Sequence, residues 1–216
     1  MKDFNGKLAV VTGGASGVGF AIGEALARRG AKVILTDIEQ ESLDNSTALL
    51  ANQSFDVFCK VSDVSHIKSM QDLAPCGQSE PGPVHLLFNN AGVALSQTVE
   101  NSTDEDWDWG LGVLLHGVIN GTRAFLPHLK ERPEAAIVNT SSIFGLLAVP
   151  TQSIYHVGKY GVRAFTESLA LEMKMENSPV EVYSVHPGHI GTNIANYGVE
   201  NDKLDIDLDQ QDERPN

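Results

Sequence analysis

Short apolar runs alternate with longer stretches of helical periodicity along most of the chain. Six runs rich in Val, Ile and Leu predict buried strands at residues 8–11, 32–36, 57–60, 84–88, 136–140 and 180–185. The stretches between them show apolar positions three and four residues apart, as in amphipathic helices, beginning with residues 18–29. Strands that alternate with helices predict an α/β fold with one doubly wound parallel sheet, which is Rossmann-like in its arrangement.

Two helices are predicted to be longer than the rest. Residues 103–129 form the first, with Thr103 and Asp106 spaced as a capping box at its start and Pro127 and Pro133 marking its far end. Residues 155–175 form the second. Its apolar stripe predicts a contact with the core or with a second subunit, and consists of Val162, Phe165, Leu169 and Met173.

Composition narrows the classes of partner. The 216 residues suit one domain, and 15 basic against 28 acidic residues give a net charge of −13, which predicts binding to neither nucleic acid nor anionic membranes. Cys59 and Cys76 are too few for a disulfide framework and are expected to be reduced thiols. The first residues run directly into a strand and no apolar run reaches membrane-spanning length, so we expect a soluble, cytoplasmic protein.

A glycine-rich turn, residues 12–19, joins the first strand to the first helix. In such a turn, Gly13 would allow the tight bend, Gly17 would let the backbone approach a pyrophosphate, and Gly19 would let the helix pack closely on the sheet. Asp37 ends the second strand about twenty residues further on, where a carboxylate accepts hydrogen bonds from ribose hydroxyls and repels a 2′-phosphate. The pattern predicts a dinucleotide site that prefers NAD(H) to NADP(H).

A phenol and an amine lie one helical turn apart at Tyr155 and Lys159, thirteen residues after Ser142. A phenol has an ordinary pKa of about 10, and a neighbouring ammonium on the same helix face would lower it. A hydroxyl from Ser142 could orient a substrate oxygen. Ser141 competes for that role, but adjacent strand residues point to opposite faces, so only one of the two serines can face a cofactor. The set indicates nicotinamide-dependent redox chemistry.

The glycine turn, the segment Asn89-Asn90-Ala91-Gly92, Ser142 and the Tyr155–Lys159 pair occur in the order found in short-chain dehydrogenases/reductases, which this chain resembles from residue 7 to about 192. The resemblance implies that Tyr155 is the general acid/base and that Ser142, rather than Ser141, binds the substrate oxygen. It implies that Lys159 lowers the pKa of Tyr155 and holds the nicotinamide ribose.

The resemblance also implies a set of cofactor contacts. Asp63 and Val64 would contact adenine, and the turn at residues 187–192 would meet the nicotinamide carboxamide. Ser16 stands where members that use NADP often have a basic residue, which again favours NAD. The cofactor-binding residues expected are Gly13, Ser16, Gly17, Val18, Gly19, Asp37, Asp63, Val64, Asn90, Ala91, Gly92, Tyr155, Lys159, Gly188, Ile190 and Thr192. His186 and His189 are expected to be structural or substrate-lining, and no metal is predicted.

The chain departs from the family pattern in two places. Leu114 replaces an asparagine that in many members holds a water linking the lysine to solvent, and neither His116 nor Asn120 is placed to replace it. The proton relay is therefore expected to be impaired. The chain also ends before the final strand of the family. We therefore expect residues 1–199 to form the dinucleotide-binding catalytic domain and residues 200–216 a solvated acidic tail, with a short, irregular edge strand in the tail as the alternative.

The sequence therefore predicts an NAD-dependent alcohol dehydrogenase or carbonyl reductase that forms a homodimer or homotetramer. Apolar residues after Ser142 favour an apolar alcohol or ketone, with plain packing as the other interpretation: Ile143, Phe144, Leu146, Leu147 and Val149. One alternative is a dinucleotide-binding protein with impaired or no catalysis, because of Leu114 and the short pocket. Another is a redox-neutral enzyme acting on a nucleotide sugar. A shared fold does not decide among them.

Overall fold

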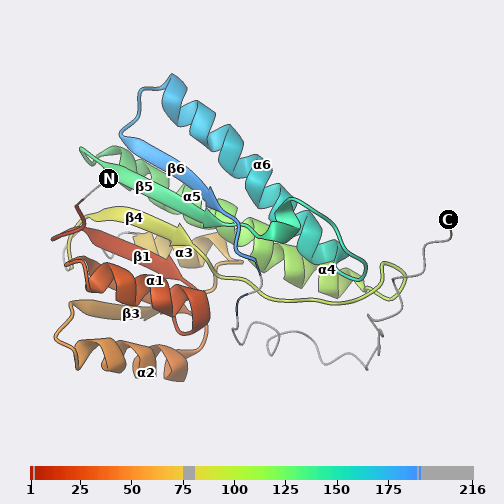
Figure 1. Ribbon diagram of the computed structural model, residues 1–216, viewed down its shortest axis with the longest axis horizontal. Coiled ribbons are helices and arrows are strands. Elements are labelled where there is room, and N and C mark those ends of the chain that lie inside the picture. The colour runs from red at the N-terminus through yellow and green to blue at the C-terminus, as the bar shows by residue number, and fades with distance from the viewer. Residues whose placement is uncertain (2, 75–80, 189, 191–216) are drawn as a thin grey trace, which may run out of the picture.

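The computed structural model describes residues 1, 3–74, 81–188 and 190. Within them lies a parallel sheet in the order β3-β2-β1-β4-β5-β6 (Figure 1). The strands are β1 (Leu8–Thr12), β2 (Lys32–Asp37), β3 (Val57–Val61), β4 (Val84–Asn89), β5 (Ala135–Thr140) and β6 (Val180–Val185). All six predicted strands are confirmed, each end to within one residue. The order reverses between β1 and β4, and such a switch point leaves a crevice at the carboxyl ends of the strands.

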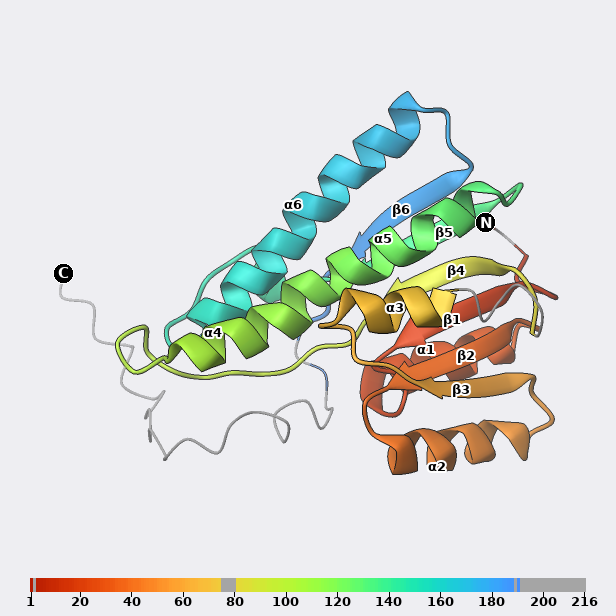
Figure 2. The same cartoon turned by 180° about the vertical axis from the view of Figure 1, so that it is seen from behind.

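Helices cover both faces of the sheet (Figures 1 and 2). The helices α1 (Gly17–Ala27) and α2 (Gln40–Ala51) pack on one face, and α3 (Ile67–Leu73), α5 (Gly117–Lys130) and α6 (Ser153–Met175) pack on the other. The alternation of side chains along β1 divides the core accordingly. Leu8 and Val10 lie in a cluster with Phe125 of α5, whereas Ala9 and Val11 lie in a second cluster with Leu43 of α2. This arrangement confirms the predicted doubly wound, Rossmann-like fold.

The first long helix begins where the sequence predicts. The N–H of Asp106 donates to the Thr103 hydroxyl at 3.2 Å, and the N–H of Thr103 donates to the Asp106 carboxylate at 2.9 Å, which completes the capping box. The helix runs through α4 (Asp104–Leu111) and a π-helical turn, η2 (Gly112–His116), directly into α5. Its axis leads away from the sheet toward the α4 end (Figure 2).

The helix ends at Lys130, one residue beyond its predicted end at residue 129, and Pro127 lies inside its last turns. Proline removes one backbone donor and is unfavourable in a helix interior. Here the buried side chains of Phe125 and Leu129 hold the last turns against the sheet, and such packing contributes more to helix stability than local propensity does.

The apolar stripe of α6 faces the core, which settles the choice left open by its periodicity. Val162, Leu169 and Met173 are buried, and Phe165 packs against the cluster that holds Leu169 and Met173. The predicted tail (residues 200–216), Thr192, His189 and Cys76 lie outside the described residues. Among the described helices, none is both long and apolar enough to cross a bilayer.

Candidate active site

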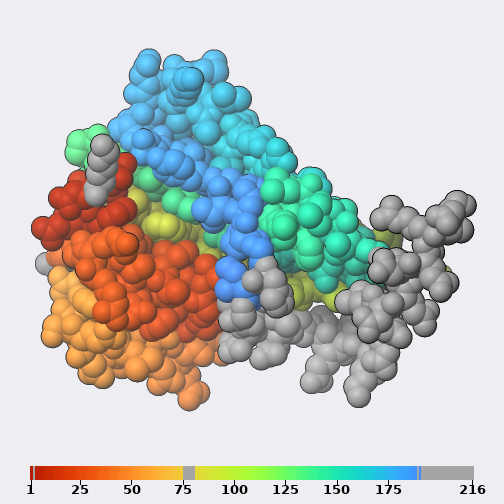
Figure 3. Space-filling view, in the orientation of Figure 1, coloured from red at the N-terminus to blue at the C-terminus, as the bar shows by residue number. Residues whose placement is uncertain are grey.

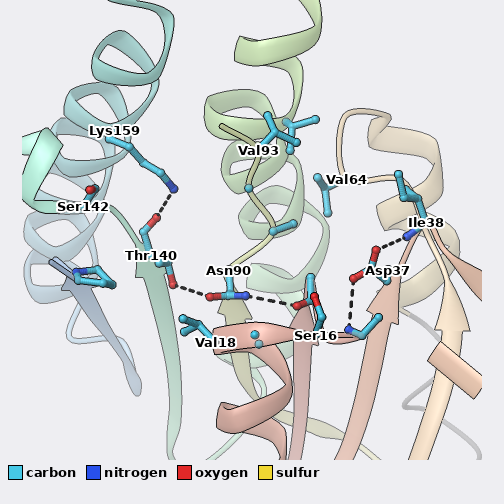
Figure 4. Close-up of a pocket in the computed structure, with 18 of the residues that line it drawn as sticks. Ser16, Val18, Asp37, Ile38, Val64, Asn90, Val93, Thr140, Ser142 and Lys159 are labelled. Atoms are coloured by element: carbon cyan, nitrogen blue, oxygen red, sulfur yellow. Dashed lines mark hydrogen bonds between the residues drawn. The ribbon is translucent and has the colours of Figure 1, made fainter. Parts of the chain in front are cut away.

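A cleft of about 330 Å³ lies at the carboxyl ends of the strands, where the loops after them meet the start of α1 (Figure 4). Each expected cofactor or catalytic residue in the described part of the chain lines it: Gly13, Ser16, Gly17, Val18, Gly19, Asp37, Asp63, Val64, Asn90, Ala91, Gly92, Ser142, Tyr155, Lys159, Gly188 and Ile190. The segment after β6, in blue, crosses between the red α1 region and the green segment after β5 (Figure 3). The fold therefore gathers motifs spread over nearly 180 residues of sequence around one cavity.

The glycine-rich turn has no room for side chains at two positions. A Cβ on Gly13, whose φ is +63°, would lie 2.8 Å from the Cα of Ala91, and a Cβ on Gly19 would lie 2.0 Å from the Gly13 carbonyl oxygen. The neighbour that excludes a side chain at Gly19 is thus the turn itself rather than the sheet. Because the first N–H groups of a helix lack partners within it, the start of α1 offers donors to a pyrophosphate. The cleft fits a dinucleotide at this point.

Asp37 ends β2 beside the glycine-rich turn. Its carboxylate accepts hydrogen bonds from the N–H of Ala15 at 3.2 Å and from the N–H of Ile38 at 2.8 Å (Figure 4). The carboxylate is therefore held at the rim of the cleft with its charge facing the turn. Among the described residues that line the cleft, Lys159 is the only lysine or arginine, so none of them offers a cation beside Asp37.

Asp63 follows β3 and organises the turn before α3. Its carboxylate accepts hydrogen bonds from the N–H and the hydroxyl of Ser65, at 2.9 and 2.7 Å, and lies 3.0 Å from Nδ1 of His66. Partial burial would raise its pKa, but the bonds from Ser65 and His66 outweigh burial and lower it. The adjacent loop carbonyls of Val64 and Ser65 accept hydrogen bonds from the amide of Asn120, so Asn120 serves this loop and not the lysine.

Two threonines that the sequence analysis did not single out hold the floor of the cleft. The hydroxyl of Thr12 accepts hydrogen bonds from the N–H groups of Asn90 and Ala91, at 2.9 and 3.0 Å. The side chain of Asn90 donates to the Thr12 carbonyl at 3.1 Å. It accepts from the Thr140 hydroxyl at 3.4 Å (Figure 4). Asn90 thus joins the ends of β1, β4 and β5. Thr12 opens the predicted glycine-rich turn, but nothing in the sequence indicates its bonds to Asn90 and Ala91 or the role of Thr140, because only the sheet brings these strand ends together.

Ser142 and Tyr155 meet at the inner end of the cleft. Ser142 follows β5, and its hydroxyl accepts a hydrogen bond from the N–H of Phe144 at 3.1 Å, which begins the 3-10 turn η3 (Ile143–Gly145). Burial raises the pKa of the Tyr155 phenol, and the nearby Ser142 side chain partly offsets the rise. The two hydroxyls therefore form one pair of polar groups in a partly apolar wall.

Lys159 lies one helical turn beyond Tyr155 and is almost fully buried. Its Nζ donates to the carbonyl oxygen of Thr140 at 2.8 Å and lies 5.6 Å from the centre of the Tyr155 ring. Burial lowers the pKa of Lys159 to about 8. In this structure burial dominates at the phenol and the amine donates to Thr140, so a lowering of the Tyr155 pKa by Lys159 stays a prediction.

The structure separates the two neighbouring serines. Ser141 turns away from Tyr155 and donates to the main-chain carbonyl of Lys159 at 2.9 Å. A Cβ on Gly145 would lie 2.4 Å from the Ser141 hydroxyl oxygen, so the contact is tight on that side as well. Ser141 therefore fastens α6 to the end of β5, and Ser142 is the serine that lines the cleft with Tyr155 and whose side chain lowers the pKa of that phenol.

Leu114 lies in the π-helical turn and is fully buried beside Leu95 and Ile154. A Cβ placed on Gly158 would come within 2.7 Å of the Leu114 Cβ. A Cβ placed on Gly92 would lie 3.7 Å from both Leu114 Cδ2 and Lys159 Nζ. An aliphatic side chain thus occupies the space between the π-helical turn and the buried amine.

The apolar residues after Ser142 remain partly exposed, which plain packing does not explain. Ile143, Leu146, Leu147 and Val149 are 36–48% exposed, although they lie beside the cleft and do not line it. His186 was expected to be either structural or substrate-lining, and its contacts are structural. Its Nδ1 lies 3.0 Å from the Ser142 carbonyl oxygen, and its Nε2 lies 3.0 Å from the Ser184 hydroxyl.

A doubly wound sheet with a glycine-rich turn at its switch point defines a dinucleotide-binding α/β protein. The family model described as short chain dehydrogenase matches residues 7–203. The chain belongs to the short-chain dehydrogenase/reductase family, whose members are oxidoreductases that bind a nicotinamide dinucleotide.

Similar proteins agree with this assignment. SadH of Mycobacterium tuberculosis, which bears the name of an oxidoreductase, is 40% identical over 90% of this chain and 71% of its own length. The NADP-dependent (R)-specific alcohol dehydrogenase of Lentilactobacillus kefiri is 35% identical over 88% of this chain and 75% of its own. The crystal structure of a family member from Burkholderia phymatum in complex with NAD matches with a TM-score of 0.89 and 36% identity, over 91% of this chain and 70% of that one. Relatives thus include users of either cofactor.

Proposed function

We propose that the protein is an NAD(H)-dependent alcohol dehydrogenase or carbonyl reductase, with Ser142, Tyr155 and Lys159 as its catalytic residues. The observation that carries the proposal is the pair formed by Ser142 and Tyr155 in the cleft that also holds the glycine-rich turn. When bound, the nicotinamide supplies the hydride acceptor or donor. The protein has to orient a substrate oxygen and move one proton.

Ser142 and Tyr155 orient the substrate oxygen, and Tyr155 moves the proton. Their hydroxyls can both bond to one substrate oxygen, which places the reacting carbon over the cleft. In ketone reduction the Tyr155 hydroxyl gives its proton to the carbonyl oxygen as the carbon receives hydride, and the phenolate is left. In alcohol oxidation the phenolate takes that proton back. A phenol whose pKa is raised by burial carries its proton at neutral pH.

Lys159 supports Tyr155 from the same face of α6. Its pKa of about 8 leaves the amine mostly protonated at neutral pH. The Thr140 carbonyl accepts a hydrogen bond from the ammonium, which lies 5.6 Å from the centre of the Tyr155 ring. A phenolate forming on Tyr155 would be stabilised by this buried charge, because electrostatic attraction is strong where water is excluded. We expect the ammonium also to bind the ribose next to nicotinamide, because Lys159 lines the same cleft.

The preference for NAD(H) rests on Asp37. Two backbone N–H groups hold its carboxylate at the cleft rim, and the neighbouring Ser16, Ile38 and Glu39 offer no positive charge to a 2′-phosphate. The carboxylate can accept hydrogen bonds from ribose hydroxyls at that position. The proposed contacts of Asp63, Val64, Asn90, Ala91, Gly92, Gly188 and Ile190 are supported by their place on the same cleft.

The substrate proposed is an apolar alcohol or ketone. Burying apolar surface is favourable by roughly 25 cal/mol per Å², and the partly exposed Ile143, Leu146 and Leu147 lie next to Ser142 in the chain. We also expect a homo-oligomer, as is typical of the family. Val157, Tyr160 and Leu171 leave apolar surface on α6 exposed for such a contact.

Replacement of Tyr155 by Phe tests the proposal. We expect the variant to bind NAD(H) within about twofold of the wild-type protein and to lose turnover by at least about 10²-fold, since general acid–base catalysis contributes that much. The assay follows NADH absorbance with a panel of secondary alcohols and ketones. Retained turnover in the variant would remove Tyr155 from the mechanism. Tight NAD binding without turnover by the wild-type protein would instead support the non-catalytic binder, which the names of the relatives do not favour.

A further inference from the structure

The residue directly after Tyr155 is a histidine whose two ring nitrogens both bond to the loop of residues 142–149. His156 is 8% exposed. Its Nδ1 lies 2.9 Å from the carbonyl oxygen of Phe144, and its Nε2 lies 2.9 Å from the backbone nitrogen of Val149. The ring also meets the ring of Phe144 edge-on, with centroids 5.2 Å apart. One side chain of α6 thus contacts the loop near its beginning and at its end.

The donors in this network determine which nitrogen of His156 carries the proton. The N–H of Val149 can only donate, so Nε2 accepts and carries no hydrogen, and Nδ1–H donates to the Phe144 carbonyl. In this neutral tautomer both nitrogens have a partner. The contact of Nε2 with the Val149 carbonyl at 3.1 Å is then an approach without a hydrogen bond.

The loop carries Ser142, and contacts on either side of the bonds to His156 fix its two ends. The N–H of Ile143 donates to the Pro187 carbonyl at 2.9 Å. At one end, the Ser142 carbonyl lies 3.0 Å from Nδ1 of His186. Beyond the other end, Thr151 adopts a left-handed conformation with φ +65°, and its carbonyl accepts from the N–H of Gln97 at 2.7 Å. A β-branched residue in that conformation is strained, which shows that the surrounding structure determines the course of the loop here.

We infer that His156 is a positioning residue that holds the 142–149 loop against α6 and thereby sets the Ser142 hydroxyl relative to the Tyr155 hydroxyl. The inference rests on the proposed function, because it concerns the same reaction. His156 touches neither the cleft lining nor the reacting atoms. It acts through the loop: Tyr155 is its neighbour in α6, and Phe144, whose N–H donates to the Ser142 hydroxyl, is its hydrogen-bond partner.

Three substitutions at this position separate the two bonds. His156→Phe keeps an aromatic ring beside Phe144 but removes both hydrogen bonds. His156→Asn places an amide near the position of Nδ1 and keeps a donor for the Phe144 carbonyl. His156→Gln places an amide near the position of Nε2 and keeps an acceptor for Val149. Tyr160→Phe is the matched control, since Tyr160 packs its ring edge against His156 from the same helix.

The experiment measures amide hydrogen exchange over residues 143–151 and, in parallel, kcat, KM and the dissociation constant of NAD(H). For His156→Phe we expect loop exchange about tenfold or more faster, with exchange in β5 and α6 unchanged, because two net hydrogen bonds are lost. We expect kcat to fall at least about tenfold, since a small displacement of a positioning group slows catalysis. Cofactor binding should stay within about twofold. The Asn and Gln variants should fall between His156→Phe and wild type, and the control should match wild type.

Each outcome decides the inference. Unchanged loop exchange in His156→Phe, or faster exchange with unchanged kcat, would overturn it. A rise in KM without a fall in kcat would also overturn it, because substrate affinity and not the geometry of the hydroxyls would then be affected. If His156→Phe does not fold, the Asn and Gln variants carry the same comparison. If the wild-type protein turns over no alcohol or ketone, the proposed function fails, and loop exchange alone decides whether His156 holds the loop.

Discussion

Removal of the charge on Asp37 should change which cofactor the protein binds. Asp37→Asn keeps a side-chain oxygen that can accept the N–H of Ile38 but removes the negative charge, and Asp37→Ala removes both. In the wild-type protein the carboxylate is held by two backbone donors at 3.2 and 2.8 Å, so it cannot turn away from a ligand without losing both bonds. A 2′-phosphate would meet a charge in a defined position.

The size of the effect follows from Coulomb's law. Two unit charges about 5 Å apart interact by roughly 3 kcal/mol at an effective dielectric constant near 20, and water at this half-buried rim lowers that figure to about 1.5–3 kcal/mol. Every 1.4 kcal/mol is about tenfold in affinity. We therefore expect Asp37→Asn to tighten NADP binding about 10- to 100-fold. NAD binding should weaken about tenfold, because hydrogen bonds to a charged acceptor contribute roughly 1.5–3 kcal/mol.

Isothermal titration of both cofactors measures these changes without a known substrate. The titrations should be run at about 0.1 M salt, where the screening length is about 10 Å, so that contacts between close charges remain visible. Glu41→Gln removes an equal charge from the exposed first turn of α2 and should leave both affinities within about twofold. An Asp37→Asn protein whose ratio of NAD to NADP affinity equals that of the wild type would refute the role given to this carboxylate.

Further predictions concern the neighbourhood of the buried amine. Ser142→Ala should lower kcat at least about tenfold. Ser141→Ala should mainly lower the unfolding free energy, by about 1–3 kcal/mol, because its hydrogen bond to α6 is lost. A kcat loss confined to Ser141→Ala, with the stability loss in Ser142→Ala, would contradict the geometry. The pKa of Lys159 is lowered to about 8 in the folded protein, so the unfolded chain holds more protons between pH 8 and about 10. The unfolding free energy of the wild type should therefore rise with pH across that window, by up to about 3 kcal/mol relative to Lys159→Met. Chemical denaturation at a series of pH values measures this difference. Parallel pH curves for the two proteins would contradict the lowered pKa of Lys159. Gly158→Ala should destabilise the protein by about 1–3 kcal/mol, because its Cβ would lie 2.7 Å from that of Leu114. Thermal unfolding measures this cost, and an unchanged midpoint would contradict the contact. If Leu114 impairs a proton relay, Leu114→Asn should raise turnover, and an unchanged rate would show that another route carries the proton.

Much of the fold could be predicted because its signals are local. A buried strand needs only a short apolar run, so the strands were located to within a residue, and the Thr103–Asp106 capping box required a spacing of three. The end of that helix was also predicted to within one residue. Pro127 lies inside its last turns, which the packing of Phe125 and Leu129 on the sheet holds in place.

The residue types of the candidate site were determined by the sequence, since the glycine turn, Asp37 and the Ser142, Tyr155 and Lys159 set are each defined by spacing. The tertiary structure decided how they are held. Thr12 and Thr140 became part of the site because β1 and β5 end beside β4, and His156 because α6 lies against the loop after β5. The tertiary structure also determined the pKa shifts: burial raises the pKa of Tyr155 and lowers that of Lys159. Burial depends on the residues that pack around a group, and the spacing of residues along the chain does not specify these neighbours.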